Sequence, residues 1–328
     1  MPADTPFSIG QVIIDPPLVQ APMAGVTHSP LRQTIASFGR PGLFFSEMLS
    51  ARHLPHDLRK NSLWIKRTEI ERPMAYQIFA ADAEEAVQGC RELLETDAEI
   101  IDLNLACPAP NIAGKRKAGA HLLSDLGTVA TMLAGLRQEV SDRPLTVKIR
   151  LGKKPDLVFL KELAALLEEN RIDAVTLHPR LVSEKLRRRA RWEYIGHLKD
   201  MSNLTVIGNG DVKSSADCHK MFAQTGCDGV MIGRAAISKP WIFAEISNNQ
   251  PMDLTPEFLF NTYSHAIDLI TNFFPMEGMA MGRIKEFTWY FSKNLKFGHR
   301  FAARMQPINS LQACQQYIKE NFLKAVEL

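Results

Sequence analysis

Over the first 245 residues, short apolar runs rich in β-branched and aromatic side chains alternate with stretches whose apolar residues recur at helical spacing. This alternation is typical of βα units, which assemble into a parallel sheet covered by helices. Eight strand-like runs favour a closed (β/α)8 TIM barrel of the α/β class over a doubly wound sheet, because no Gly-x-Gly-x-x-Gly follows the first run. The predicted strands are 19–25, 42–48, 74–80, 99–107, 145–151, 174–180, 204–210 and 229–235.

The pattern changes after Ile242, and the remaining residues show only helical periodicity. A polar connector, NNQPMDLTPEF, comes first, and in it Thr255 and Pro256 have the residue types of a helix N-cap and first turn. Apolar helical segments follow at 259–273, 286–301 and 309–328. We therefore expect a barrel domain at 1–246 and a small C-terminal α-helical bundle at 250–328.

Composition narrows the class of protein. With 328 residues, of which 45% are apolar, the chain can bury a large core, which excludes a disordered protein. Its five cysteines are odd in number and scattered without zinc spacing, so we expect neither disulfides nor a bound metal. The N-terminus lacks the pattern of a signal peptide, and no stretch approaches the ~20 apolar residues of a membrane helix, which predicts a soluble, cytoplasmic protein without membrane contact.

The net charge is only +3, but the basic residues are clustered. Lys115, Arg116 and Lys117 are consecutive, and five of the seven residues from 185 to 191 are lysine or arginine. Such a run is usually a solvated face, so by itself it indicates nucleic acid only weakly. Clusters in a chain of nearly balanced charge favour a local contact with a polyanion over a globally basic binder.

Polar side chains occur where buried strands should be apolar. In the run 145–151, Val147 and Ile149 share one face while Lys148 and Arg150 share the other, because side chains alternate along a strand. In a barrel the second face looks into the lumen, where two cations are very costly unless they stand at the open mouth beside anionic or polar groups. The same alternation, or a place at the carboxyl end of a strand, singles out Gln77, Asp102, Asn104, Thr176, His178, Arg180 and Asn209. We expect these side chains to converge at one mouth.

Each of these residues also has a simpler interpretation. A histidine or glutamine at a strand end is more often a hydrogen-bonded core residue than a ligand, which favours a structural role for His178 or Gln77 taken alone. Buried lysines are rare without a partner, so a functional role is favoured for Lys148. Asp102 is expected to orient its neighbours or to satisfy backbone groups.

The glycine-bearing ends of the last two strands indicate what the mouth holds. GNGD (208–211) and the pair Gly233 and Arg234 follow these strands, where barrel proteins commonly bind a phosphate through backbone N–H groups. Arg234 can add a bidentate contact, and the polar residues of GNGD can hold the loop or a ribityl hydroxyl. GNGD alone could be an ordinary turn, but the combination favours a phosphorylated cofactor such as FMN. Lys148 and His178 could then stabilise the negative charge of a reduced flavin.

The chain resembles the tRNA-dihydrouridine synthases over nearly its full length. The resemblance rests on the order and spacing of APMAGVT (21–27), SEM (46–48), NLACP (104–108), VKIRLG (147–152), His178 with Arg180, IGNGD (207–211) and DGVMIGR (228–234). It implies a barrel with tightly bound FMN, followed by a helical domain that helps bind tRNA. It also implies reduction of a uridine in tRNA to 5,6-dihydrouridine, with NADPH or NADH reducing the flavin.

The resemblance further implies roles for individual residues. Contacts along the flavin ring are implied for Pro22, Met23 and Ala24. Polar contacts to the isoalloxazine are implied for Gln77, Lys148 and His178. The ribityl and phosphate site is implied for Asn209, Gly210, Asp211, Gly233 and Arg234. On the substrate side, contacts with the uracil or the RNA are implied for Asn104, Arg150 and Arg180.

Cys107 matches the proton donor of the family. Reduction of the uracil 5,6 double bond needs a hydride at C6, which flavin N5 can supply, and a proton at C5 from the opposite side. A thiol with a pKa near ~8.5 is mostly protonated at neutral pH and can serve as this acid. A nucleophilic cysteine would need a base or cation to lower its pKa, and no sequence neighbour supplies one, although Lys148 could do so in space. We therefore favour a proton donor over a nucleophile, and a structural cysteine least.

The target base must leave the RNA stack to reach a flavin inside a barrel mouth, so base flipping is implied. The loop 112–121 would close over the base while Lys115, Arg116 and Lys117 meet phosphates. The chain departs from the family pattern in this region, because Ala106 stands where glycine is usual before the cysteine. Other departures are His28 in place of aspartate, HPRL (178–181) in place of HGRT, and ARW (190–192) in place of Ala-Asp-Trp. These departures touch the substrate side and leave the target uridine open.

Two rival functions stay open at this point. A flavin barrel enzyme could instead act on a free pyrimidine, of the dihydroorotate or dihydropyrimidine type, and would not need the basic loop or the helical tail. An RNA-binding barrel without catalysis is the second rival, and the presence of Cys107 and Lys148 argues against it.

Overall fold

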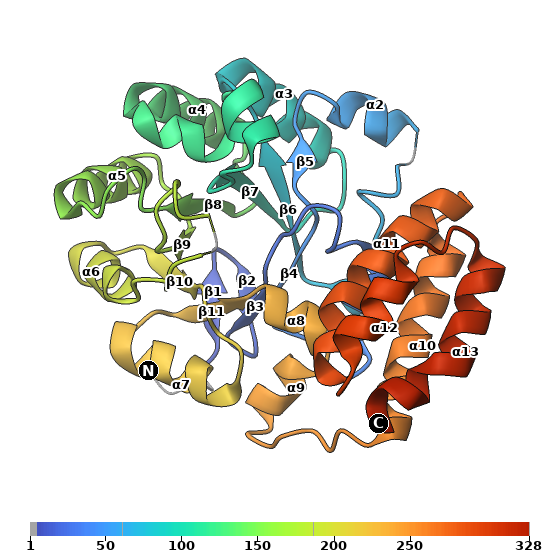
Figure 1. The fold of residues 1–328 in the computed structure, drawn as a ribbon. Helices are drawn as coiled ribbons and strands as arrows, with labels where there is room; N and C mark the ends of the chain where they lie inside the picture. The colour runs from blue at the N-terminus through green and yellow to red at the C-terminus, as the bar shows by residue number, and fades with distance from the viewer. Residues whose placement is uncertain (1–4, 61, 186, 328) are drawn as a thin grey trace. The chain divides into compact units, whose positions relative to one another are not determined.

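A parallel barrel forms the core of the first of the two units of the chain (Figure 1). The structure is a computed structural model that describes residues 5–60, 62–185 and 187–327. Neighbouring strands pair in the order β3-β11-β10-β9-β8-β7-β6-β4, and the isolated parallel bridge from Val19 to Leu43 brings the two ends of this order together. The expected (β/α)8 barrel is therefore confirmed. Its strands are β3 (Leu18–Gln20), β4 (Phe44–Phe45), β6 (Met74–Phe79), β7 (Ile100–Leu105), β8 (Leu145–Arg150), β9 (Ala174–His178), β10 (Thr205–Asn209) and β11 (Gly229–Ile232), with β5 (Leu49–Ser50) beside β6.

The first two barrel strands are shorter than the apolar runs that predict them. β3 ends at Gln20, because Pro22 has no N–H to donate and the chain then turns, with the N–H of Val26 and of Thr27 donating to the Met23 carbonyl at 3.1 and 3.0 Å. The second run, 42–48, contains only the two-residue β4, and β5 follows just after the run ends. The run of apolar residues therefore sets where a strand lies but not where it ends.

A β-hairpin that the sequence analysis missed closes the amino-terminal end of the barrel. β1 (Phe7–Ile9) and β2 (Val12–Ile14) pair antiparallel across Gly10, whose φ of +56° favours glycine. Ile9 and Ile14 are fully buried and share one apolar cluster with side chains from most of the barrel strands, which are Val19, Leu43, Phe45, Ala75, Ile100, Ala174, Ile207 and Met231. This cluster forms an apolar floor beneath the lumen.

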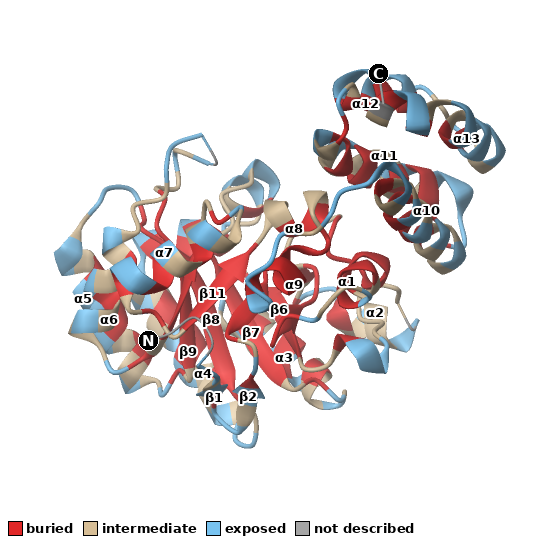
Figure 2. Cartoon of the chain, turned by 90° about the horizontal axis from the view of Figure 1, so that it is seen from below, coloured by how far each residue is buried: buried red, intermediate tan, exposed pale blue. Residues whose placement is uncertain are grey.

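Helices cover the outside of the barrel and bury one face each (Figure 2). In α3 the N-cap Asp82 accepts a hydrogen bond from the N–H of Glu85, and Gly226 ends α7 in the left-handed conformation with φ +61°. These caps explain why the helices begin and end where they do. The helices are α2 (Leu54–Arg59), α3 (Ala83–Leu94), α4 (Leu126–Glu139), α5 (Leu157–Glu169), α6 (Glu193–Met201) and α7 (Ser215–Thr225), with the short turns η2 (Pro110–Lys115) and η3 (Gly119–Ser124).

By its packing the chain divides into two compact units. The first contains the barrel and consists of the chain up to Pro22 together with 41–66 and 72–232. The second consists of 23–40, 67–71 and 233–328. This division differs from the expected boundary at 246–250, because the helix that follows β3, α1 (Ser29–Ala36), packs against α10 (Pro256–Phe273). The expected domain boundaries stay a prediction.

The second unit is helical. α10 begins as the sequence predicts, with Thr255 Oγ1 accepting a hydrogen bond from the N–H of Phe258 at 3.1 Å. The apolar segment 286–301 is not one helix, because the chain breaks between α11 and α12. A Cβ on Gly298 would lie 1.7 Å from the Ser292 carbonyl oxygen, so the break needs glycine. The remaining elements are η1 (Glu69–Glu71), α8 (Arg234–Ser238), α9 (Ile242–Ser247), α11 (Glu277–Phe291), η4 (Ser292–Asn294), α12 (Gly298–Met305) and α13 (Leu311–Glu327).

Candidate functional site

The barrel lumen is apolar at its amino-terminal end and polar at its carboxyl-terminal end. Strand register places Asn104 beside Lys148, and Arg150 beside His178. All four side chains are buried, as are Gln77, Asp102, Thr146, Thr176, Arg180 and Asn209. The alternation of the strands thus brings the predicted polar residues of the first unit to one mouth.

Asp102 is the centre of a hydrogen-bond network within this mouth. Its carboxylate accepts hydrogen bonds from Gln77 Nε2 at 2.7 Å and from Thr146 Oγ1 at 2.6 Å. Burial raises the pKa of Asp102 to about 6, against the lowering effect of these two donors and of the Lys148 charge. Gln77 Oε1 in turn accepts a hydrogen bond from Asn104 Nδ2 at 2.7 Å. The network therefore fixes the orientation of both amide side chains.

Asn104 also fixes the turn that carries Cys107. Its Oδ1 accepts hydrogen bonds from the backbone N–H groups of Ala106 and Cys107 at 3.0 and 2.9 Å. Burial raises the pKa of the Cys107 thiol above its ordinary value, so the thiol keeps its proton at neutral pH. The Cys107 carbonyl accepts from the N–H of Ala120 at 3.0 Å, and a Cβ on Gly119 would lie 2.8 Å from the same oxygen. The loop after Cys107 thus packs back against the cysteine.

Lys148 is a buried amine within the polar mouth. Its Nζ donates to Asn209 Oδ1 at 3.1 Å, and Asn209 Nδ2 donates to the Met231 carbonyl at 2.8 Å. Burial, and then the neighbouring charge of Arg150, lower the pKa of Lys148 to about 7, although the charge of Asp102 opposes this. Because the pKa of Lys148 lies near neutral pH, an anionic group beside the amine would raise that pKa and favour the protonated form.

The loop 208–211 at the end of β10, called the glycine loop below, is fixed by contacts with several neighbouring side chains. Trp192 Nε1 donates to the Gly210 carbonyl at 2.8 Å, and Gly210 has φ +119°. A Cβ there would lie 3.0 Å from His178 Cδ2, so the position needs glycine. Asp211 pairs with Arg180, whose Nη1 lies 2.8 Å from His178 Nε2. His178, Gly210 and Asp211 therefore form one rigid wall of the mouth.

The predicted RNA-contacting loop is only partly free to bind. Arg116 Nη2 lies 2.8 Å from both carboxylate oxygens of Glu85, which fixes this side chain. Lys115 and Lys117 are exposed, and among the described residues neither has a carboxylate partner. Two of the three cations are thus available to a polyanion.

Several of the predicted cofactor residues lie outside the barrel unit. Pro22 is its last residue in this part of the chain, while Met23 and Ala24 open the second unit. Gly233 and Arg234 follow β11 and start the part of the second unit that contains α8. The expected contacts of these residues with a cofactor stay predictions.

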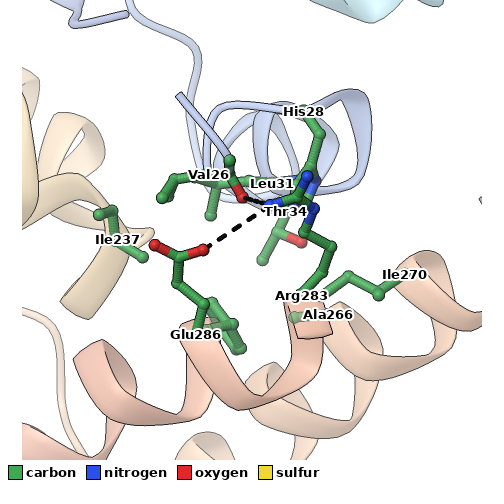
Figure 3. Close-up of a pocket in the computed structure, with 11 residues that line it drawn as sticks. Val26, His28, Leu31, Thr34, Ile237, Ala266, Ile270, Arg283 and Glu286 are labelled. Atoms are coloured by element: carbon green, nitrogen blue, oxygen red, sulfur yellow. Dashed lines mark hydrogen bonds and ion pairs between the residues drawn. The ribbon is translucent and has the colours of Figure 1, made fainter. Parts of the chain in front are cut away.

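Within the second unit, the turn that contains Met23 and Ala24 borders a small pocket (Figure 3). Arg283 of α11 reaches into it, where its Nη1 donates to the Gly25 carbonyl at 2.8 Å and lies 3.8 Å from a carboxylate oxygen of Glu286. His28 caps α1, with Nδ1 accepting from the N–H of Leu31 at 3.3 Å. Burial, and then the charge of Arg283, lower the pKa of His28 to about 3, so this imidazole is neutral at physiological pH.

Two residues, Asp102 and Trp192, fix the geometry of the mouth to a greater extent than the sequence predicts. Asp102 links two strands through its hydrogen bonds, and Trp192 fastens the glycine loop. Strand alternation signalled Asp102, which lies on the same face as Asn104. No periodic signal marks Trp192, because it lies in a loop and acts through a backbone carbonyl.

The donor set of the mouth fits the isoalloxazine of FMN. The edge of that ring offers carbonyl acceptors and an N–H, and it becomes anionic when reduced. Lys148 supplies a buried amine with a pKa of about 7, and the amide of Gln77 is already oriented by Asp102. Each amide group can make further hydrogen bonds beyond those given above. The mouth therefore contains side chains with the hydrogen-bond donors and acceptors that such a ring needs.

The described residues offer neither an evident metal site nor a membrane span. Among them, no group of three or more histidine, cysteine, aspartate and glutamate side chains is placed to hold a metal ion. No helix in the same part of the chain is long and apolar enough to cross a bilayer.

The fold and site define a class, a (β/α)8 barrel protein with a buried lysine and a protonated thiol at a polar mouth. The sequence model described as "Dihydrouridine synthase (Dus)" matches residues 19–327. The chain is 32% identical over 326 residues to tRNA-dihydrouridine synthase B of Escherichia coli (strain K12), an alignment that covers 96% of this chain and 99% of that protein. It is 31% identical over 320 residues to tRNA-dihydrouridine synthase B of Pseudomonas aeruginosa, with 96% and 95% covered. The chain belongs to the dihydrouridine synthase family.

Solved structures support the same fold. Morphinone reductase in complex with tetrahydroNAD superposes with a TM-score of 0.57 at 10% identity, covering 77% of this chain and 92% of that chain. Histamine dehydrogenase from Rhizobium sp. 4-9 superposes with a TM-score of 0.58 at 12% identity, covering 81% and 51%. At these identities the likeness concerns the barrel fold alone.

Proposed function

We propose that this chain reduces a uridine in tRNA to 5,6-dihydrouridine, with FMN as resident cofactor and NADPH or NADH as reductant. Family membership, and relatives named for this reaction that align with 96% of the chain, support the proposal. The structural observation that best supports this reaction is the hydrogen bonding of Asn104. Its Oδ1 accepts from the backbone of the Cys107 turn, and its Nδ2 donates to the Gln77 amide. We place the reaction in the cytoplasm, where tRNA is found.

FMN, when bound, supplies the hydride for the uracil ring. Lys148 would gain a proton and stabilise negative charge on the ring edge, because its pKa near 7 rises beside an anion. Asn209 holds the Lys148 amine in place through the 3.1 Å hydrogen bond. The cofactor contacts proposed for this chain are those of Pro22, Met23, Ala24, Gln77, Lys148, His178, Asn209, Gly210, Asp211, Gly233 and Arg234.

Cys107 would deliver the proton to C5 of the uracil. Its raised pKa keeps the thiol protonated until the reaction needs the proton. Asn104 fixes the backbone of the Cys107 turn, so the thiol is presented in a defined place. A base reaches this place only after it has left the RNA stack, and Lys115 and Lys117 would meet phosphates beside it.

The test is a comparison of native protein with Cys107→Ala. Purified native protein should show the absorption spectrum of a flavin and should form dihydrouridine in unmodified tRNA with NADPH. Cys107→Ala should keep the flavin and lose the product, while free uridine and dihydroorotate should be poor substrates for both. Native protein that carries flavin and binds tRNA without forming dihydrouridine would refute the proposal.

A further inference from the structure

The loop between β9 and α6 presents consecutive arginines at the edge of the barrel mouth. Arg187, Arg188 and Arg189 are exposed, and among the described residues none of the three forms an ion pair with a carboxylate, although Arg188, after Arg191, helps to lower the pKa of Glu184 by its charge. The nearby Arg191 is different, because its guanidinium donates to both oxygens of Glu184 at 2.6 and 2.7 Å. The loop therefore presents exposed positive charge on three consecutive side chains, with the exposed Lys185 shortly before them.

A buried arginine of β8 holds the first half of this loop from inside the barrel. Arg150 Nη1 donates to the carbonyl oxygens of Leu181 and Lys185 at 3.2 and 2.8 Å, although Arg150 itself is only 4% exposed. Lys185 has φ +52°, a conformation that a residue with a side chain rarely adopts. The contact with Arg150 stabilises this bend just before the exposed arginines.

A second buried arginine holds the other half. Arg180 Nε donates to the Arg188 carbonyl at 2.5 Å, and the same guanidinium pairs with Asp211. Asp211 Oδ2 also accepts from the backbone N–H of Ala190 at 2.8 Å. The backbone on both sides of the arginine run is thus tied to the wall of the mouth, while the arginine side chains themselves are exposed.

We propose that Arg187, Arg188 and Arg189 form a prearranged phosphate-binding surface for the RNA strand on either side of the target base. The inference rests on the proposed function, since it assumes that RNA is the substrate. Guanidinium groups bind phosphate oxygens in bidentate geometry, and a loop that is already fixed loses less freedom when it binds. Three adjacent cations suit the successive phosphates of a strand better than the single 2′-phosphate of NADPH. Arg150 and Arg180 then act as positioning residues for this surface.

The experiment compares two variants with the same change of net charge. One replaces the three arginines, as Arg187→Gln, Arg188→Gln and Arg189→Gln. The control replaces three exposed cations of the barrel unit, two on α5 and α7 and one in the turn after α5, as Lys161→Gln, Lys220→Gln and Arg171→Gln. For both we would measure flavin content, the rates of flavin reduction by NADPH and NADH without RNA, kcat and KM for unmodified tRNA, and the salt dependence of tRNA binding.

The arginine variant should raise the KM for tRNA about tenfold or more and lower the log–log salt slope of tRNA binding by roughly two units, because each lost phosphate contact removes about 0.7–0.9. Its flavin content, its kcat and its reduction by NADPH should match those of the control. An unchanged KM and salt slope would overturn the inference, and so would a loss confined to reduction by NADPH. If native protein forms no dihydrouridine, the proposed function fails, and the direct tRNA-binding comparison still decides the inference.

Discussion

Arg283 Nη1 donates a hydrogen bond to the Gly25 carbonyl at 2.8 Å (Figure 3). The two residues are far apart in sequence, and the contact joins α11 to the turn that carries Met23 and Ala24. Gly25 has φ +80°, and a Cβ there would lie 2.7 Å from the same Nη1 atom. Glycine and arginine therefore depend on each other at this point, and the contact fixes the turn within the second unit.

Replacing Arg283 with methionine should loosen this turn. The variant keeps most of the side-chain volume but lacks the donor, so we expect a loss of about 1–2 kcal/mol in the free energy of unfolding. The turn should also hold the cofactor less well, which the release of fluorescent flavin on dilution would measure. Lys285→Met, on the same helix, serves as the control. Equal stability and equal flavin release in the two variants would contradict the role given to Arg283.

His28 should make stability fall in acid. Its folded pKa is about 3 and its ordinary value is 6.5, so between these values the unfolded chain binds a proton that the folded chain does not. The contribution is therefore fully present above pH 6.5 and is lost as pH falls towards 3. Urea unfolding of native protein and of His28→Asn, which keeps an N-cap acceptor, should diverge by about 2–3 kcal/mol between pH 7 and pH 4.5. If the free energies of unfolding of the two proteins changed equally with pH, the imidazole would not be held neutral in the folded protein.

Cys107→Ala should lower the rate of dihydrouridine formation by about 10²–10⁴-fold, the usual contribution of a general acid. In native protein the rate of the step that depends on the thiol should stay constant through neutral pH. It should decline only in the alkaline range, above the ordinary pKa of a thiol, because burial raises the pKa of Cys107 further. Single-turnover assays over a pH series would measure this. A decline that begins near pH 7 would indicate a thiolate and would favour a nucleophile.

Lys148→Met should stabilise the protein without cofactor while weakening the binding of FMN. The amine has a pKa of about 7 when folded and 10.5 ordinarily, so between these values the unfolded chain binds more protons and native stability rises with pH. Methionine removes this penalty, which should raise stability at pH 7 by roughly 1–4 kcal/mol. Thermal unfolding of cofactor-free protein and flavin titration would measure the two effects. A variant that is less stable and still binds FMN tightly would contradict both.

The barrel and much of its mouth could be predicted from the sequence because they depend on local alternation. The period of two along 145–151 was sufficient to put Lys148 and Arg150 on one face, and the strand register then places Asn104 and His178 beside them. Such a pattern is contained within each strand, so it can be recognised without knowing the contacts with residues that are distant in sequence.

The features that could not be predicted depend on contacts between distant residues. The strands of the β1–β2 hairpin are three residues each, too short to show a period, and they are stabilised by packing against the barrel floor. The break between α11 and α12 depends on the close approach of Gly298 to Ser292, whereas the apolar spacing there continues unbroken. The pairing of Arg283 with Gly25 likewise leaves no local pattern.

The apolar floor that Ile9 and Ile14 complete closes the amino-terminal end of the barrel. If the flavin lies at the polar end of the lumen, as proposed, the electron donor and the RNA base would both approach it from that end and would have to take turns there. The hairpin of six paired residues would then favour a fixed order of events in turnover.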